Sequence, residues 1–314
     1  MKFNLMVVMA IMVLNGCQFD ECSDPDEVTT IRQPHCIVRD SFGDYLLGTN
    51  QALYRSDSLL SSWTVYGFDK YVHRLVILPN SQIVLASYGA LHTSTDNGKS
   101  WKIITPLSTG YAIMDMVTHN EDIYVAVWKG GVYKSSDYGN TWGKLDNDSV
   151  SKDVEHIAID PDGYLFVGTR DGLFRSTLEG KNWFKAYSNY IEVLEVNSNH
   201  EMYIASNSKT LFSTDAGHSW LDIDFGHGRT NGIGFSDSEY VFVSNESQLF
   251  RKKTNDSSWT IINSNFRYCQ KLLTFSKEQI IAISWEGVRV SHDGGFTWEE
   301  RNKGLYYTYT ECAE

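Results

Sequence analysis

The chain has little of several features that point to common catalytic classes. It contains five cysteines and five prolines in 314 residues, and its nine histidines are scattered. No Cys-x-x-Cys, His-Glu-x-x-His or Gly-x-Ser-x-Gly string occurs. The spacings typical of zinc sites, zinc proteases and serine hydrolases are therefore absent from the sequence. We expect no metal, no cofactor and no catalytic residue.

Positive charge is also scarce. The 27 basic side chains are outnumbered by 39 acidic ones, which gives a formal net charge of −12, and no basic stripe appears. A surface of this sign repels phosphate backbones and anionic lipid headgroups. Nucleic acid is thus excluded as an expected partner, and membrane association is expected only through a lipid anchor.

Long hydrophobic runs are missing except for one near the N-terminus. Lys2 precedes an apolar stretch from Leu5 to Leu14, which is too short to span a membrane and is typical of a signal peptide. The stretch ends in Leu14-Asn15-Gly16-Cys17, which resembles the bacterial lipoprotein box. This resemblance implies a signal peptide over residues 1–16 and lipidation of Cys17. The alternative is an ordinary signal peptide that leaves Cys17 for a disulfide.

Residues 17–30 are expected to form an acidic tether. Within it, Gln18-Phe19-Asp20-Glu21 resembles the export signal of surface lipoproteins in Bacteroidetes. The N-terminal segment therefore predicts an exported bacterial protein that is held at the outer membrane or the cell surface.

Tryptophan, by contrast, is abundant and periodic. Seven of the nine tryptophans recur at intervals of 37 to 41 residues: Trp63, Trp101, Trp142, Trp183, Trp220, Trp259 and Trp298. Each interval carries short runs of β-branched and aromatic residues bounded by polar turns, which are strand signals. A repeat of about 40 residues with strand patterns is typical of a β-propeller blade. The sequence therefore predicts a single seven-bladed propeller over residues 31–314.

Four of the tryptophans end the same string, Ser-x-Asp-x-Gly-x-x-Trp. Serine and aspartate oxygens form hydrogen bonds with turn backbone, glycine permits positive φ, and tryptophan buries a large ring. The copies consist of Ser94, Asp96, Gly98 and Trp101; Ser135, Asp137, Gly139 and Trp142; Ser213, Asp215, Gly217 and Trp220; and Ser291, Asp293, Gly295 and Trp298. The copy at Trp183 lacks the aspartate, and those at Trp63 and Trp259 lack both aspartate and glycine.

These strings resemble the Asp-box, or bacterial neuraminidase repeat. That repeat recurs in sialidases, xyloglucan-cleaving propellers, sortilin-type receptors and the propeller factor that assists photosystem II assembly. The resemblance implies an all-β propeller of four-stranded antiparallel blades with Asp-box corners, and it implies that these corners are structural and lie away from the functional face. It does not specify an activity.

Four cysteines remain after Cys17, and in an exported chain they allow up to two disulfides in three connectivities. In repeat register Cys36 opens the first inner strand and Cys269 the last, and these strands become neighbours when the ring closes. A Cys36–Cys269 disulfide is therefore expected to lock the ring. Cys22 and Cys312 are then left to join the tails, although Cys312 is also placed to reach Cys36.

Strand alternation divides the turns of each blade between two faces. The turn after the inner strand shares one face with the Asp-box corner, and the middle turn shares the other face with the connection between blades. The first face carries short polar turns, whereas the second carries the candidate binding residues. These are Trp128, Trp285, Tyr88, Arg170, His73, Arg74, Tyr111, Glu155, His156, Tyr190, His227, Arg229 and Tyr268.

The candidate face has two interpretations. In the first, aromatic rings and charged groups line a shallow funnel that binds a glycan or an envelope protein. In the second, the tyrosines that recur at each connection only pack on the next blade. Trp128 and Trp285 fall outside the period, so they are better binding candidates than the repeated tyrosines. The sequence thus favours a non-catalytic binding or assembly module, expected to be monomeric.

A sialidase-like glycoside hydrolase is the alternative. That family grips a carboxylate with three arginines, and this chain offers Ile31-Arg32-Gln33-Pro34 as a partial match to the first arginine's string, with Arg74 and Arg229 as further candidates. A carboxylate such as Glu155 would then act in the chemistry. Sialidases have six blades, however, and the tryptophans here predict seven. Xyloglucan-cleaving enzymes have seven, but their cleft lies between two propellers.

Overall fold

The computed structural model describes residues 26–104, 111–145, 150, 153–223, 228–236, 239–254, 256, 258–263, 266, 269–276 and 278–311, with backbone only for 26–29 and 307–311. These residues form strands, turns and loops, and none of them is in a helix. They belong to two compact units, of which the larger spans Ile31–Leu305.

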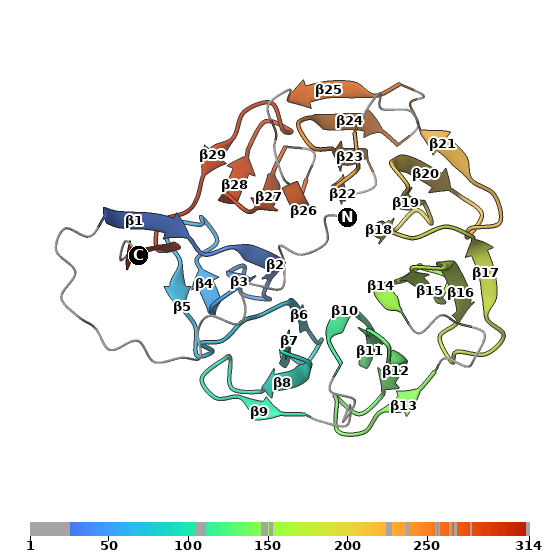
Figure 1. Cartoon of the computed structure of the whole chain (residues 1–314), viewed down its shortest axis with the longest axis horizontal. Coiled ribbons are helices and arrows are strands. Elements are labelled where there is room, and N and C mark those ends of the chain that lie inside the picture. The colour runs from blue at the N-terminus through green and yellow to red at the C-terminus, as the bar shows by residue number, and fades with distance from the viewer. Residues whose placement is uncertain are drawn as a thin grey trace. The chain divides into compact units, whose positions relative to one another are not determined.

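The larger unit is a ring of seven four-stranded antiparallel sheets, and each sheet uses four consecutive strands (Figure 1). The predicted seven-bladed fold is therefore confirmed. Blades 1 to 4 comprise β2 (Pro34–Arg39), β3 (Tyr45–Thr49), β4 (Leu53–Ser56) and β5 (Thr64–Val65); β6 (Arg74–Ile77), β7 (Ile83–Ser87), β8 (Ala90–Ser94) and β9 (Lys102–Ile103); β10 (Ile113–His119), β11 (Asp122–Val127), β12 (Gly131–Ser135) and β13 (Gly143–Lys144); and β14 (Val154–Ile159), β15 (Tyr164–Thr169), β16 (Gly172–Thr177) and β17 (Phe184–Tyr187).

Blades 5 to 7 repeat the pattern. They comprise β18 (Val193–Val196), β19 (Met202–Ser206), β20 (Lys209–Ser213) and β21 (Leu221–Ile223); β22 (Gly232–Ser236), β23 (Tyr240–Ser244), β24 (Leu249–Lys253) and β25 (Thr260–Asn263); and β26 (Cys269–Thr274), β27 (Ile280–Ser284), β28 (Gly287–Ser291) and β29 (Glu299–Glu300). Every outer strand begins at the residue after a periodic tryptophan. The repeat therefore marks the start of the fourth strand of each blade.

The second strand of each blade is the most apolar part of the chain. All five residues of β3, β7, β19 and β27 are buried. Both faces of such a strand pack against a neighbouring blade, so the strand reads as a continuous apolar run rather than an alternating one. The core of the ring consequently consists of layers between blades, with one cluster of buried side chains at each.

The ring closes between blade 1 and blade 7 without a shared strand. The inner strand β2 contacts both β26 and β27, and one core cluster joins the two blades around Trp63. The backbone N–H of Trp63 donates to Lys303 O at 2.8 Å, and its indole N–H donates to Arg301 O at 2.7 Å. Packing and these two hydrogen bonds take the place of a strand exchanged between the ends of the ring.

The four Ser-x-Asp-x-Gly-x-x-Trp strings share the serine and aspartate hydrogen bonds of one corner, and only the indole of Trp220 differs, because it donates to Ala186 O rather than to its own glycine. In blade 2, Ser94 Oγ lies 2.8 Å from an Asp96 carboxylate oxygen and accepts the Gly98 N–H at 2.8 Å. Asp96 also accepts the Ser100 N–H at 2.9 Å, and the indole of Trp101 donates to Gly98 O at 3.2 Å. The hydrogen bonds from Ser100 hold the pKa of Asp96 down to about 2. The carboxylate is thus engaged in the turn itself.

The predicted Cys36–Cys269 disulfide is wrong, because both thiols are free and buried. The neighbouring strands β2 and β26 do touch, but a β-bulge shifts the register. Cys36 follows the bulge in β2 and pairs with Gly48, whereas Cys269 precedes the bulge in β26 and pairs with Ser284. The two side chains therefore lie in different core clusters, between blades 1 and 2 and between blades 6 and 7. Burial raises the pKa of each thiol to about 12.

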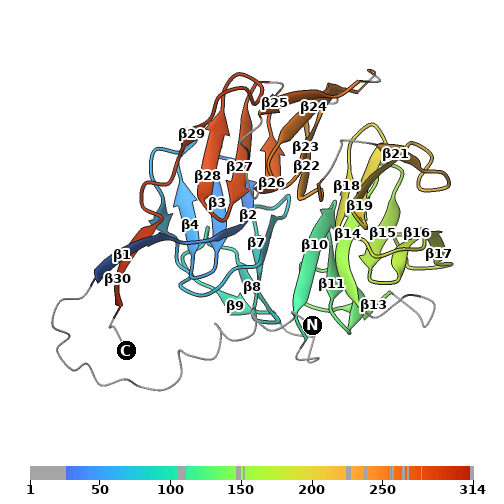
Figure 2. The same cartoon turned by 45° about the horizontal axis from the view of Figure 1, so that its top comes forward.

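The smaller unit contains the described ends of the chain. β1 (Asp26–Ile31) pairs with β30 (Tyr306–Glu311) in a two-stranded sheet (Figure 2). Residues 26–30, expected to belong to the tether, are thus part of a strand. Cys17, Cys22 and Cys312 lie outside the described residues. Among the residues that are described, no helix is long and apolar enough to cross a membrane.

Candidate functional site

The inner strands of all seven blades contribute to one cavity of about 410 Å³, here called the central cavity. It lies where the inner strands begin, on the side that carries the middle turns and the blade connections, which we call the connection face. The opposite side, with the Ser-x-Asp-x-Gly-x-x-Trp corners, is the corner face. The histidines and charged side chains that line the cavity are His35, His73, Arg74, Asp115, His156, Glu192, Glu195 and Lys271.

β-Bulges explain why polar side chains reach this cavity. The ladders of blades 1, 3, 4 and 7 each skip one residue near the start of the inner strand. A bulge leaves one residue unpaired and re-aims its neighbours. The skipped residues in blades 1 and 7 are His35 and Gln270, and both line the cavity.

Asp115 joins three blades at one wall of the cavity. Its carboxylate accepts the Arg74 Nε–H from blade 2 at 3.0 Å. It also accepts the backbone N–H of Met116 at 3.0 Å and that of Ile157, in blade 4, at 3.2 Å. A carboxylate with this many donors is fixed in position.

A second ion pair crosses the cavity between blades that are not adjacent. Lys271 of blade 7 lies 2.5 Å from a carboxylate oxygen of Glu195 in blade 5. The charge of Glu195 raises the pKa of Lys271 despite the burial of the ammonium group. On the rim, Arg229 lies 3.1 Å from Glu192. Opposite charges therefore balance one another throughout the cavity.

Three histidines complete the lining. Burial, reinforced by the charge of Arg74, lowers the pKa of His35 to about 4 and that of His73 to about 3. Burial also lowers the pKa of His156. The ring of His73 lies 2.9 Å from the Tyr71 hydroxyl and 3.1 Å from Met114 O. At neutral pH the cavity thus presents neutral imidazoles together with paired charges.

These histidines make the stability of the propeller depend on pH. A free histidine titrates near pH 6.5. Below that pH the unfolded chain binds protons that His35 and His73 do not bind in the folded protein, and this proton binding favours the unfolded state. The free energy of unfolding therefore has its full value above pH 6.5 and decreases as the pH falls towards 4. We expect the free energy of unfolding to fall by about 1.4 kcal/mol per pH unit for each histidine inside this window. Urea unfolding at pH 7 and pH 5 measures it.

The control for this prediction is the double variant His35→Gln/His73→Gln. Glutamine keeps polar atoms in the cavity but does not titrate, so the slope between pH 7 and pH 5 should flatten. An unchanged slope in the double variant would assign the acid sensitivity to other groups.

An aromatic pocket of about 440 Å³ adjoins the central cavity between blades 2 and 3. Its apolar walls are the rings of Tyr71 and Tyr88 together with Ile113 and Met114, and His73 lines both the pocket and the cavity. The two tyrosine rings lie 5.3 Å apart at a tilt of 38°. Tyr88 is 78 % exposed, so its ring is available to a ligand.

The backbone of Tyr88 is strained. Tyr88 and Gly89 form the two-residue turn between β7 and β8, with φ values of 45° and 79°. Turns of this kind favour asparagine followed by glycine, because both central residues need positive φ. Blade 5 has asparagine at the equivalent position, Asn207, with φ of 50°. A large, exposed side chain at such a position is a reason to look for a function.

Other predicted residues form a separate group near blades 4 and 5. Glu155 lies 3.0 Å from Arg170 Nε and accepts the Tyr190 hydroxyl at 2.6 Å. Arg170 and Tyr190 line a shallow polar pocket of about 760 Å³. The charge of Glu155 and burial together raise the pKa of Tyr190 to about 12, with burial the larger cause. The sequence thus indicated one site for the residues of two groups, one at the central cavity and one around Glu155.

The two tryptophans outside the period differ from each other. Trp285 is 47 % exposed, as expected for its turn, and its indole N–H faces the side-chain amide of Gln270, which lines the central cavity. Trp128 is only half-buried, not exposed. It pairs through its backbone with Asp153 of the next blade, and the Lys129 ammonium covers its ring at 4.4 Å. Trp128 is therefore a weaker candidate than the sequence indicated.

The remaining candidates are accounted for as follows. Tyr111 is 40 % exposed and lies beside the turn at Gly89. His227 and Tyr268 lie outside the described residues. His35, Glu195 and Lys271 line the central cavity but were missed by sequence reasoning. His35 and Lys271 share one signal, a polar residue in the first half of an inner strand, whereas Glu195 lies third of four residues in β18.

The three arginines of the sialidase hypothesis do not form one cluster. Arg32 lies over the ring of Tyr54 at 5.6 Å, whereas Arg74 pairs with Asp115 and Arg229 with Glu192. Of the three, only Arg74 lines the central cavity. The arrangement differs from one in which three guanidinium groups grip a single carboxylate.

No family model matches the sequence, and no curated protein matches it. Several solved structures share the fold. The extracellular domain of a putative one-component system from B. thetaiotaomicron has a TM-score of 0.69 and 13 % identity over 84 % of this chain, which spans 38 % of that protein. A GH74 xyloglucanase from Xanthomonas campestris has a TM-score of 0.71 and 12 % identity, with coverage of 90 % of this chain and 56 % of the enzyme.

A third neighbour is covered over nearly its whole length. YCF48 from Cyanidioschyzon merolae has a TM-score of 0.70 and 12 % identity over 85 % of this chain and 98 % of its own. A second YCF48 structure contains the protein bound to D1 peptide. Its TM-score is 0.68 and its identity 15 %, over 86 % of this chain and 97 % of the YCF48 chain. At these identities the comparisons establish the fold alone: the chain is a seven-bladed β-propeller similar in fold to that extracellular domain, to the xyloglucanase and to YCF48.

Proposed function

We propose that this propeller is a non-catalytic binding or assembly module at the bacterial cell envelope. It binds a glycan or a segment of another protein on the connection face, as a monomer held to the membrane through lipidated Cys17. The observation that carries the proposal is Tyr88, an exposed aromatic residue in a strained turn, which forms one wall of the aromatic pocket beside the central cavity.

The state of the carboxylates supports binding over hydrolysis. Asp115 and Glu195 are each paired with a basic residue that lines the cavity, Glu192 is paired with Arg229 on its rim, and Glu155 is paired with Arg170 of the separate polar pocket. A glycosidase needs one carboxyl group kept protonated by an apolar environment as the general acid. Each of these carboxylates lies instead within 3.1 Å of a guanidinium or ammonium nitrogen, which is not an apolar environment. In such pairs the carboxylates can accept, and their arginine or lysine partners can donate, hydrogen bonds with a bound ligand.

The structural neighbours are compatible with this role. One is an extracellular domain and another has been solved with a bound peptide, so the seven-bladed ring serves as a recognition surface elsewhere. The resemblance of the N-terminal segment to a lipoprotein signal supports export of the present chain. Lipid attachment is tested separately, by Cys17→Ser, which should release the protein from membranes into the soluble fraction.

The class of function is tested by running two assays on the same preparation. A panel of fluorogenic glycosides that includes a sialoside measures turnover, while glycan and peptide arrays measure capture. We expect capture of one ligand class without turnover on any glycoside. Turnover that is lost in Glu155→Gln would overturn the non-catalytic proposal.

Tyr88→Asn tests the site. Asparagine suits the positive φ, and this gain offsets the lost contact with Tyr71, so the free energy of unfolding should change by less than about 1 kcal/mol. Affinity for the captured ligand should drop at least about tenfold, as expected for an aromatic anchor. Phe42→Ser, on the corner face where Phe42 is 73 % exposed, is the matched control and should bind normally. Equal binding by Tyr88→Asn and wild type would remove the aromatic pocket from the site.

A further inference from the structure

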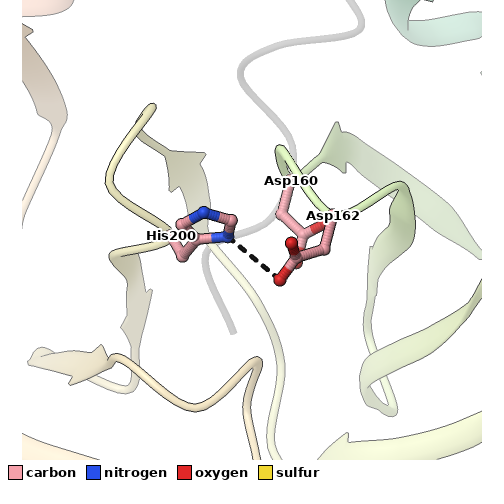
Figure 3. Close-up of side chains that lie close together, drawn as sticks. All are labelled: Asp160, Asp162 and His200. Atoms are coloured by element: carbon pink, nitrogen blue, oxygen red, sulfur yellow. Dashed lines mark ion pairs between the residues drawn. The ribbon is translucent and has the colours of Figure 1, made fainter.

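Three metal-ligating side chains from two adjacent blades converge on the corner face (Figure 3). Asp160 and Asp162 lie in the turn between β14 and β15 of blade 4, and His200 lies in the matching turn between β18 and β19 of blade 5. One ligand atom from each lies within 4.8 Å of the others. His200 Nδ1 is 3.1 Å from an Asp162 carboxylate oxygen, and both side chains point into the space between the turns.

Asp160 carries a buried charge without a basic partner. It is only 4 % exposed, and its carboxylate accepts the Tyr164 N–H at 2.8 Å within its own turn. No lysine or arginine in the described part of the chain forms an ion pair with it. A buried carboxylate in this state is unfavourable unless a cation joins it.

Blade 1 shows how the same turn is neutralised elsewhere. Asp40 occupies the position of Asp160, accepts the Asp44 N–H at 2.9 Å, and is paired with Arg55 at 3.0 Å. The counterpart of Arg55 in blade 4 is Arg175, which donates instead to Ala216 O at 2.7 Å. In blade 4 the arginine equivalent to Arg55 therefore forms its hydrogen bond elsewhere and does not pair with Asp160.

Blade 5 shows that the turn itself needs no charge. Asn197 holds the equivalent position, and its amide oxygen accepts the Glu201 N–H at 2.9 Å. The negative charge at Asp160 is therefore not explained by the turn. His200 adds a nitrogen, Nδ1, that is buried and lies 3.1 Å from the Asp162 carboxylate without the geometry of a hydrogen bond.

We propose that Asp160, Asp162 and His200 bind one Zn²⁺ ion, which links blade 4 to blade 5 on the corner face. Zinc accepts carboxylate oxygen and imidazole nitrogen at about 2.0 to 2.2 Å in tetrahedral geometry, with water as a fourth ligand. Small rotations of the exposed Asp162 side chain and the half-buried His200 side chain would bring the donors to that geometry. The imidazole favours zinc over calcium or magnesium, which prefer oxygen ligands alone. The ion supplies the positive charge that Asp160 lacks.

The test is a calorimetric titration of chelator-treated protein, without a histidine tag, with ZnCl₂ at pH 7.5. We expect one ion per chain, a rise in the melting temperature with Zn²⁺, and little heat from CaCl₂. Asp160→Asn, which keeps the turn as Asn197 does, and His200→Asn should each weaken Zn²⁺ binding at least about tenfold, because each removes a ligand.

His292→Asn is the matched control, since His292 is exposed beside a carboxylate, Asp293, but belongs to no cluster of three ligands among the described residues. It should bind Zn²⁺ as the wild type does. The proposal would be overturned if the protein did not bind one Zn²⁺ ion per chain, or if it bound Ca²⁺ as tightly as Zn²⁺. It would also be overturned if Asp160→Asn and His200→Asn bound Zn²⁺ as tightly as the wild type. Circular dichroism confirms that each variant is folded.

Discussion

Trp63→Ala is expected to lower the free energy of unfolding by about 3 to 5 kcal/mol, the range for truncating a fully buried aromatic side chain. Trp63 is 2 % exposed, whereas the other six periodic tryptophans are half-buried. It also makes the hydrogen bonds to Arg301 and Lys303 that join blade 7 to blade 1. Since no strand is shared at this seam, the loss falls on the closure of the ring.

The matched control is Trp142→Ala. Trp142 begins an equivalent outer strand, but its ring is half-buried and its indole donates to Gly139 O within its own corner at 3.0 Å. Truncation there should cost clearly less, because part of the ring is already in water. Urea unfolding followed by tryptophan fluorescence and circular dichroism measures both variants. Equal losses would mean that Trp63 has no special part in closing the ring.

Asp115→Ala should destabilise the propeller by about 3 to 5 kcal/mol, because it leaves the partly buried Arg74 guanidinium without its carboxylate. The backbone N–H groups of Met116 and Ile157 also lose their acceptor, and an unsatisfied donor adds to the loss. The substitution thus removes one group that holds blades 2, 3 and 4 together at the central cavity.

A double-mutant cycle separates these contributions. Arg74→Met removes the unpaired charge, so the double variant Asp115→Ala/Arg74→Met should be more stable than Asp115→Ala alone. Contacting residues of this kind show coupling energies of about 0.5 to 3 kcal/mol. Additive losses in the cycle would show that the ion pair does not support the wall of the cavity.

The fold was predictable because each repeat contains a tryptophan at nearly the same position. Seven tryptophans precede the seven outer strands, and the polar turns around them alternate in a regular meander. The two faces followed from strand alternation alone, and the structure places His73, Arg74 and His156 together on the expected one. In a regular strand successive side chains point to opposite faces, so the position of a residue in the strand predicts the face on which it lies.

The irregular positions were not predictable. A bulge shifts pairing by one residue and re-aims the side chains beside it, so Cys36 and Cys269 appeared equivalent when their bulges lie on opposite sides of them. The same shift concealed His35 as a residue of the central cavity. Asp160 and His200 were missed for a different reason. They belong to successive repeats and meet only when two blades pack side by side.

The account rests on the connection face as the binding surface, and hydrogen–deuterium exchange with the ligand that the arrays identify tests this most directly. We predict slower exchange in residues 71–74, 88–89, 111–116 and 284–287, which surround the aromatic pocket and the central cavity. The turns of the corner face, including residues 94–101 and 291–298, should exchange at unchanged rates. Protection confined to the corner face, with none at Tyr88 or Arg74, would contradict the proposed function.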